Sequence, residues 1–117
     1  MNHIFYLKTC NTCMRILKEL NPTSNIKLQD IKEHPITVNQ LESLERLAGS
    51  YEALFSKRAK LYTEMGLKNA DLKEADFKHY LLEHYTFLKR PVIVLDQNIF
   101  IGNSSKVVAA AKKKMND

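Results

Sequence analysis

The feature that most constrains the fold is a pair of cysteines, Cys10 and Cys13, that follows the apolar run 4–7. A short apolar run followed by this spacing is typical of a strand that leads into a helix. If Cys10 begins that helix, its sulfur lies near unpaired backbone N–H groups and the positive end of the helix dipole. That environment favours the thiolate, which is the nucleophilic form of cysteine. Cys13, one turn later, is then placed to attack an adduct on Cys10 and release it as a disulfide.

Two other uses of such a pair compete with redox chemistry. A structural zinc site needs two further ligands at a suitable spacing, and only His79 and His84 come close to one. Both fall in a segment predicted to be helical, where a packing or solvated role is simpler, so we expect no metal site. A purely structural disulfide would close a loop too short to restrict the unfolded chain much. The pair therefore predicts thiol redox chemistry.

Length and composition indicate one ordinary globular domain. The chain has 117 residues, 44% hydrophobic and 26% charged, which is enough for a single core. No apolar run is long enough to cross a bilayer, and Lys8 and Asn11 interrupt any signal-like segment near the N-terminus. We therefore expect a cytoplasmic protein without a membrane partner, in a compartment where a lone cysteine pair is more often catalytic than structural.

The net charge of +5 is modest, and part of it lies in the lysine run 112–114. Lysines after an alanine-rich helix complement the helix dipole. A nucleic-acid surface needs more clustered cations together with aromatic or base-reading elements, so we expect no direct nucleic-acid binding.

Hydrophobic periodicity and capping residues predict a strand, a helix and a strand, then three helical segments, then two strands and a last helix. Thr37 and Gln40 form a capping box, and Gly49 ends the helix that they begin. The predicted strands are 3–7, 26–31, 92–95 and 99–101, and the predicted helical segments are 11–20, 37–49, 51–65, 71–85 and 105–114. The sequence leaves open whether 51–65 is one continuous helix. The first two strands should be parallel, joined by a right-handed crossover. The last two should form an antiparallel hairpin.

This order, with the cysteine pair at the first junction and Arg90-Pro91 before the third strand, is that of a thioredoxin-like α/β domain. We expect one domain over 1–117 with a helical insert at about 37–86 and a mixed four-stranded sheet flanked by helices. The sequence resembles the arsenate reductase (ArsC) family and its Spx-type relatives. The resemblance rests on the segments 6–13, 55–62, 88–94 and 101–104.

The resemblance implies roles for particular residues. Cys10 matches the family's nucleophile, and Arg90 matches an arginine that helps to hold an oxyanion. Pro91 matches a proline with a cis peptide bond that packs against the cysteine loop. Arg58 resembles the arginine of a Ser-x-Arg segment in Spx-like members. Asn11 and Thr12, between the cysteines, complete the residues expected to contact substrate.

The sequence also departs from the family at named positions. Single-cysteine arsenate reductases carry three arginines around the cysteine. The first of these falls nearest Ser56 and the last on Asn103, so both are neutral here. Cys13 is typical of Spx-like members rather than of that reductase type. The fold therefore transfers more safely than arsenate as a substrate.

Two functions follow from the pattern. In the first, the protein is a thiol-dependent reductase in which Cys10 attacks an oxyanion or a disulfide and Cys13 resolves the intermediate. Arg90 and Arg58 stabilise negative charge, and Arg15 is a further candidate for lowering the pKa of Cys10. No cofactor would be bound, and electrons would come from glutathione with glutaredoxin, or from thioredoxin. We expect such an enzyme to be a monomer.

In the second function, the protein is a Spx-like regulator that senses oxidation and binds the α subunit of RNA polymerase. The segment 55–60 and Gly49 fit that pattern. The disulfide between Cys10 and Cys13 would then alter a protein-binding face near Arg90.

Overall fold

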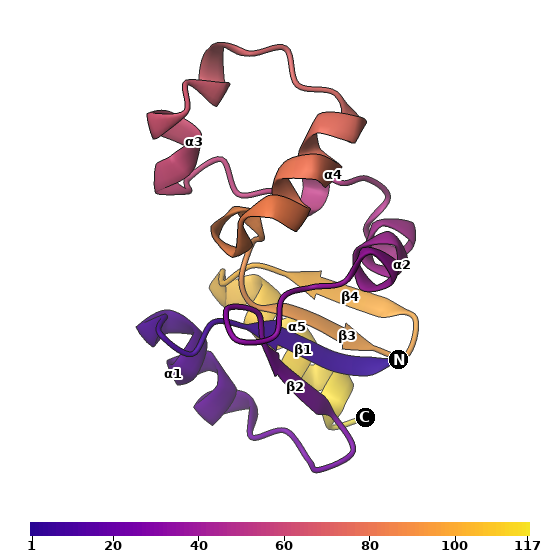
Figure 1. The fold of residues 1–117 in the computed structure, drawn as a ribbon. Helices are drawn as coiled ribbons and strands as arrows, with labels where there is room; N and C mark the ends of the chain where they lie inside the picture. Colours follow the sequence, from indigo (N-terminus) through magenta and orange to yellow (C-terminus); the bar gives the residue numbers. More distant parts are fainter. The chain divides into compact units, whose positions relative to one another are not determined.

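A mixed four-stranded sheet positions the cysteine pair (Figure 1). The computed structural model describes all residues, 1–117. The sheet has the order β2-β1-β3-β4. Its strands are β1 (Asn2–Tyr6), β2 (Lys27–Asp30), β3 (Val92–Leu95) and β4 (Asn98–Ile101). β1 pairs in parallel with β2, whereas β1 with β3 and β3 with β4 are antiparallel. The expected α/β class and mixed sheet are confirmed.

Two helices cover one face of this sheet: α1 (Asn11–Leu20) and α5 (Ser105–Met115). β1 and β3 contribute the paired residues Ile4 and Ile93 to the core beneath them. The other buried members of this core are Ile16, Leu17, Leu20, Leu95, Val108 and Ala111. The helical spacing of these side chains on α1 and α5 is what brings both helices onto the same apolar surface. The sheet and these two helices form one compact unit, residues 1–34 and 90–117.

The second compact unit, Pro35–Lys89, is helical. Its elements are α2 (Val38–Ala48), η1 (Glu52–Leu54), α3 (Lys60–Glu64), η2 (Leu67–Asn69), α4 (Glu74–Glu83) and η3 (Tyr85–Phe87). The predicted capping box of α2 is present, since Thr37 and Gln40 exchange side-chain and backbone hydrogen bonds of 3.0 and 3.1 Å. Gly49 ends the helix in a left-handed conformation, φ 96°, as glycine allows at little cost.

The predicted helical stretch 51–65, whose continuity the sequence left open, is broken between η1 and α3. Phe55 forms an isolated antiparallel bridge with Leu88 instead of continuing a helix. The Ser56 N–H donates to the Phe87 carbonyl at 2.6 Å, and the Lys89 N–H donates to the Leu54 carbonyl at 2.9 Å. The Phe55 ring is buried and stacks on Phe87 with centroids 4.9 Å apart. Tertiary pairing with 87–89 therefore overrides local helix propensity at this point.

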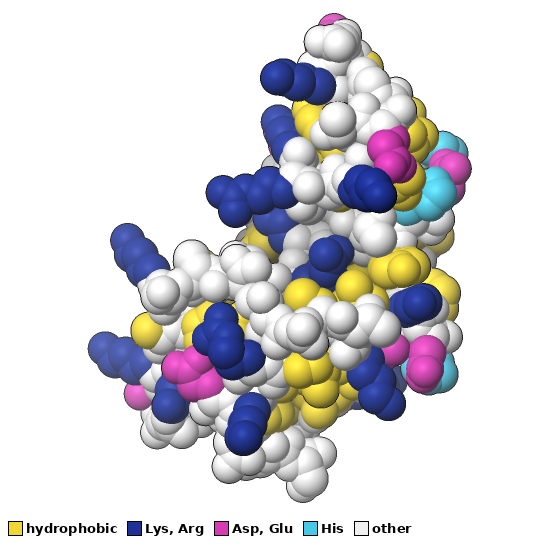
Figure 2. All heavy atoms as spheres, turned by 90° about the vertical axis from the view of Figure 1, so that its left-hand side faces the viewer, with side chains coloured by type: hydrophobic (Ala, Val, Ile, Leu, Met, Phe, Trp, Pro, Cys, Tyr) yellow, Lys and Arg dark blue, Asp and Glu magenta, His cyan; other side chains and the backbone are white.

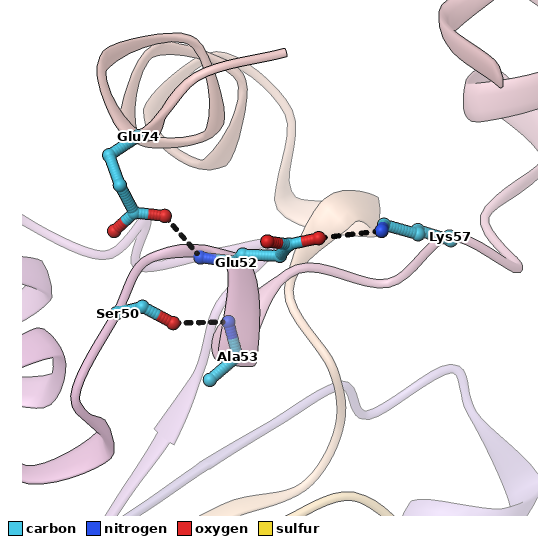
Figure 3. Close-up of polar contacts among 5 residues, drawn as sticks. All are labelled: Ser50, Glu52, Ala53, Lys57 and Glu74. Atoms are coloured by element: carbon cyan, nitrogen blue, oxygen red, sulfur yellow. Dashed lines mark hydrogen bonds and ion pairs between the residues drawn. The ribbon is translucent and has the colours of Figure 1, made fainter. Parts of the chain in front are cut away.

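The next predicted helix, 71–85, is shorter than expected and spans Glu74–Glu83. Its first residue, Glu74, accepts hydrogen bonds from the backbone at the start of η1 (Figure 3). The Glu74 carboxylate accepts the N–H groups of Tyr51 and Glu52 at 2.7 and 3.2 Å. The Ser50 hydroxyl accepts the Ala53 N–H at 3.0 Å, so early backbone donors around η1 are satisfied by side chains.

No helix of the structure combines the length and the apolar character needed to span a membrane.

We expect Glu74→Ala to destabilise the protein by about 1 kcal/mol, because two N–H groups lose a charged acceptor. Urea denaturation, followed by circular dichroism, would measure the change. Glu64→Ala is the matched control, since Glu64 is also an exposed helical glutamate and its ion pair, to Lys60, is 3.7 Å long and exposed. Equal unfolding midpoints for the two variants would contradict the expectation.

Candidate active site

The site is built on the turn that joins β1 to α1. β1 ends at Tyr6, and the Cys10 N–H closes the turn by donating to the Leu7 carbonyl at 3.0 Å. Cys10 is the N-cap of α1, with extended backbone angles of φ −93° and ψ 112°, and its carbonyl accepts the Met14 N–H at 3.1 Å. The predicted strand-to-helix position of the pair is therefore correct. Both thiols are free; Cys10 is partly exposed and Cys13 is fully buried.

The environment of Cys10 favours its thiolate. Burial, the largest single effect, acts to raise the pKa, but it is outweighed by four effects that lower it. The Cys13 N–H and the Cys13 thiol donate hydrogen bonds to the Cys10 sulfur, Arg90 contributes positive charge, and the Thr12 N–H donates a further bond. The net pKa of Cys10 lies below the ordinary cysteine value. The sulfur lies at the N-terminus of α1, where backbone N–H groups favour negative charge.

Cys13 shows the opposite shift. Burial raises its pKa to about 11, and the charge and hydrogen bond of Cys10 act in the same direction. A backbone hydrogen bond from Leu7 and the charge of Arg90 only partly offset this rise. The partly exposed Cys10 thiol therefore ionises more readily than an ordinary cysteine, whereas the buried Cys13 thiol keeps its proton at neutral pH.

Arg90 is the cation whose charge acts on both thiols. It lies two residues before β3, the strand next to β1, and its bond to Pro91 is cis, as the resemblance implied. Pro91 is buried, and its carbonyl accepts the Gly102 N–H at 3.0 Å, which ties this segment to the end of β4. Arg15, the other cation considered for this role, is exposed on α1.

The remaining predicted site residues divide between the two units. Asn11 is exposed and Thr12 partly exposed in the first turn of α1, so they belong to the same junction as Cys10. Arg58 lies in the helical unit, exposed, between η1 and α3, and Ser56 precedes it there. Asn103 is exposed just before Ser104, the N-cap of α5.

Lysine and arginine side chains are scattered among neutral atoms on the face drawn in Figure 2.

Two polar residues at the end of β2 were given no role by the sequence analysis. Gln29 and Asp30 are buried, and the Asp30 carboxylate accepts the Lys8 N–H at 3.2 Å in the turn before Cys10. The signal in the sequence was a glutamine and an aspartate inside a segment otherwise typical of a buried strand. No group of three or more His, Cys, Asp or Glu side chains lies within reach of one metal ion.

The sequence of this chain matches the model of a known protein family. The family model of the ArsC family matches residues 5–111. No protein of curated function matches the chain. Among solved structures, the arsenate reductase from Vibrio cholerae has 20% identity and a TM-score of 0.77, with 94% of this chain and 96% of that chain covered.

Two further solved structures share the fold. A protein from Staphylococcus aureus COL has 24% identity and a TM-score of 0.73, with 95% and 98% of the two chains covered. An arsenate reductase (ArsC) related protein from Brucella melitensis has 17% identity and a TM-score of 0.70, with 93% and 92% covered. These similarities show the fold, and the family model spans most of the sequence. The chain therefore belongs to the ArsC family.

Proposed function

We propose that the protein is a thiol–disulfide reductase in which Cys10 is the nucleophile and Cys13 the resolving thiol. The observation that carries the proposal is the placement of a partly exposed thiol and a fully buried thiol at one strand-to-helix junction, with pKa values shifted in opposite directions. A lowered pKa at the partly exposed sulfur supports attack on an external substrate. A buried, protonated sulfur beside it supports the second step rather than the first.

In the first step the Cys10 thiolate attacks one sulfur of a substrate disulfide. A bond forms between the Cys10 sulfur and that sulfur, the substrate S–S bond breaks, and the other substrate sulfur leaves as a thiolate. Positive charge at Arg90 and the N–H groups of Thr12 and Cys13 stabilise the attacking thiolate before the reaction.

The second step becomes easier once the first has occurred. In the mixed disulfide Cys10 no longer carries negative charge and no longer accepts the Cys13 thiol proton, so two effects that raise the pKa of Cys13 disappear. The hydrogen bond from Leu7 and the charge of Arg90, which lower the pKa of Cys13, remain. Cys13 then loses its proton to solvent, attacks the Cys10 sulfur and expels the second substrate thiolate. The protein is left as a Cys10–Cys13 disulfide, which an external dithiol such as thioredoxin, or glutathione with glutaredoxin, reduces.

A disulfide is favoured over arsenate as the substrate because the chain lacks arginines that the family uses. The cation that acts on Cys10 is Arg90. Ser56 and Asn103 match positions at which single-cysteine arsenate reductases carry arginine, and both are neutral, so the chain has fewer of the cations that those enzymes use to hold a tetrahedral oxyanion. Reduction of an oxyanion uses the same two thiols and is an outcome that the assay below distinguishes.

Alkylation with iodoacetamide across the pH range would test the assignment of the two thiols. Because the pKa of Cys10 is lowered, its rate should reach half of its plateau at a pH below that of a free cysteine. Cys13, with a pKa of about 11, should carry a thiolate in about one molecule in a thousand at pH 8 and stay unlabelled there. Peptide mass spectrometry would assign the label. Equal labelling of both cysteines at pH 8 would contradict the assignment.

Turnover would test the reaction. With NADPH and a thioredoxin or glutaredoxin system, the wild-type protein should reduce a mixed glutathione disulfide faster than arsenate. Cys10→Ser should reduce the rate to that of the coupling system alone. Cys13→Ser should stop after the first step and accumulate a glutathione adduct on Cys10, visible by mass spectrometry.

Arsenate turnover that equals or exceeds disulfide turnover would overturn the choice of substrate. Full activity in Cys10→Ser would overturn the mechanism. A protein that shows no reductase activity, and that binds the α subunit of RNA polymerase only in its oxidised disulfide form, would favour the Spx-like regulator instead.

A further inference from the structure

Asp30 is a buried carboxylate at the end of the edge strand β2. Asp30 is 8% exposed, and it pairs in register with Tyr6, the last residue of β1. A buried acid needs hydrogen bonds to offset the loss of water. Here Oδ1 accepts two backbone N–H groups, from Lys8 at 3.2 Å and from Lys32 at 3.4 Å. Both partners are neutral peptide groups.

The bond to Lys8 holds the chain just beyond the point where the sheet ladder ends. The last rung is the Ile31 N–H donating to the Tyr6 carbonyl at 2.9 Å. After Tyr6 the chain turns toward Cys10 and leaves the ladder, so the Lys8 N–H has no strand partner. Asp30 supplies one with its side chain. The two bonds, at Tyr6 and at Lys8, fix the backbone on both sides of Leu7.

Leu7 is the residue through which both cysteines are tied to the sheet. Its carbonyl accepts the Cys10 N–H at 3.0 Å, which sets the N-cap position of α1. Its own backbone group hydrogen-bonds to the Cys13 sulfur. A displacement of Leu7 would therefore move the two groups that react in the proposed function.

We propose that Asp30 is a positioning residue that fixes the turn before Cys10 by accepting the Lys8 N–H, and so holds the two sulfurs in their reactive arrangement. The inference rests on the proposed function of Cys10 as nucleophile. Asp30 acts as a hydrogen-bond acceptor and not through its charge, because its carboxylate is not among the charges that act on Cys10. An asparagine, whose side-chain oxygen accepts the same bond, should therefore substitute for it.

The test compares Asp30→Ala with Asp30→Asn by the rate of Cys10 alkylation at pH 7. Loss of the acceptor should slow the reaction of Asp30→Ala by about threefold or more, since one hydrogen bond supports the arrangement. Asp30→Asn should react at the wild-type rate. Asp71→Ala is the matched control, because Asp71 is an exposed carboxylate paired with Lys73 at 2.9 Å in the helical unit. It should leave the rate unchanged.

A wild-type rate in a folded Asp30→Ala overturns the proposal, and so does an equal loss in Asp30→Ala and Asp30→Asn. Native-state hydrogen exchange of the Lys8 amide tests the contact in the wild-type protein without any variant. Slow exchange supports the bond to Asp30, and exchange at the rate of an unprotected amide overturns it. If Cys10 of the wild-type protein reacts no faster than a free cysteine, the proposed function fails, whereas a reactive Cys10 that is indifferent to Asp30→Ala defeats this inference alone.

Discussion

The chemistry of this protein depends on the free backbone N–H groups in the first turn of α1. A helix leaves its first N–H groups without partners inside the helix, and something must accept them. Cys10 occupies the N-cap of α1 without a side-chain capping hydrogen bond. Its position beside the Thr12 and Cys13 N–H groups, together with the charge of Arg90, lowers the pKa of its thiol. The start of the helix therefore favours the thiolate at Cys10.

That arrangement would be of little use if both sulfurs responded alike. They do not, because three residues of helix carry the chain from the partly exposed N-cap to the fully buried first turn. Burial keeps the proton on Cys13, and the thiolate of Cys10 reinforces this by its charge. When Cys10 is ionised, Cys13 therefore keeps its proton, as expected for strongly interacting groups in a confined site. In the proposed reaction, consuming the Cys10 thiolate removes two effects that raise the pKa of Cys13, which orders the two steps.

The elements with strong local signals were predictable from the sequence. α1, β3 and α2 begin and end within a residue or two of their predicted positions, because capping residues and branched apolar runs mark them. The stretch 51–65 was not predictable, since Phe55 pairs with Leu88, far along the chain, and no local pattern announces that bridge. At the site, the cysteines and Arg90 were found from spacing and resemblance. Asp30 was not, because its importance lies in a backbone partner, Lys8, and a backbone N–H leaves no trace in the sequence.

The end of β2 shows why such residues matter more for position than for stability. Gln29 and Asp30 would add more hydrophobic stabilisation as leucine and isoleucine, yet each is buried with polar partners. Gln29 accepts the Nε2–H of His3 at 2.9 Å and donates to the His34 carbonyl at 2.8 Å. Burial lowers the pKa of His3, and the charge of Lys27 acts in the same direction, whereas the Gln29 hydrogen bond partly counters them. The neutral form of the ring is therefore favoured, which suits a series of hydrogen bonds between neutral groups. Contacts between apolar side chains are not directional, whereas each of these hydrogen bonds requires a defined distance and angle between its two groups. Two consecutive residues of one edge strand thus fix where the chain leaves the sheet and where it turns toward Cys10.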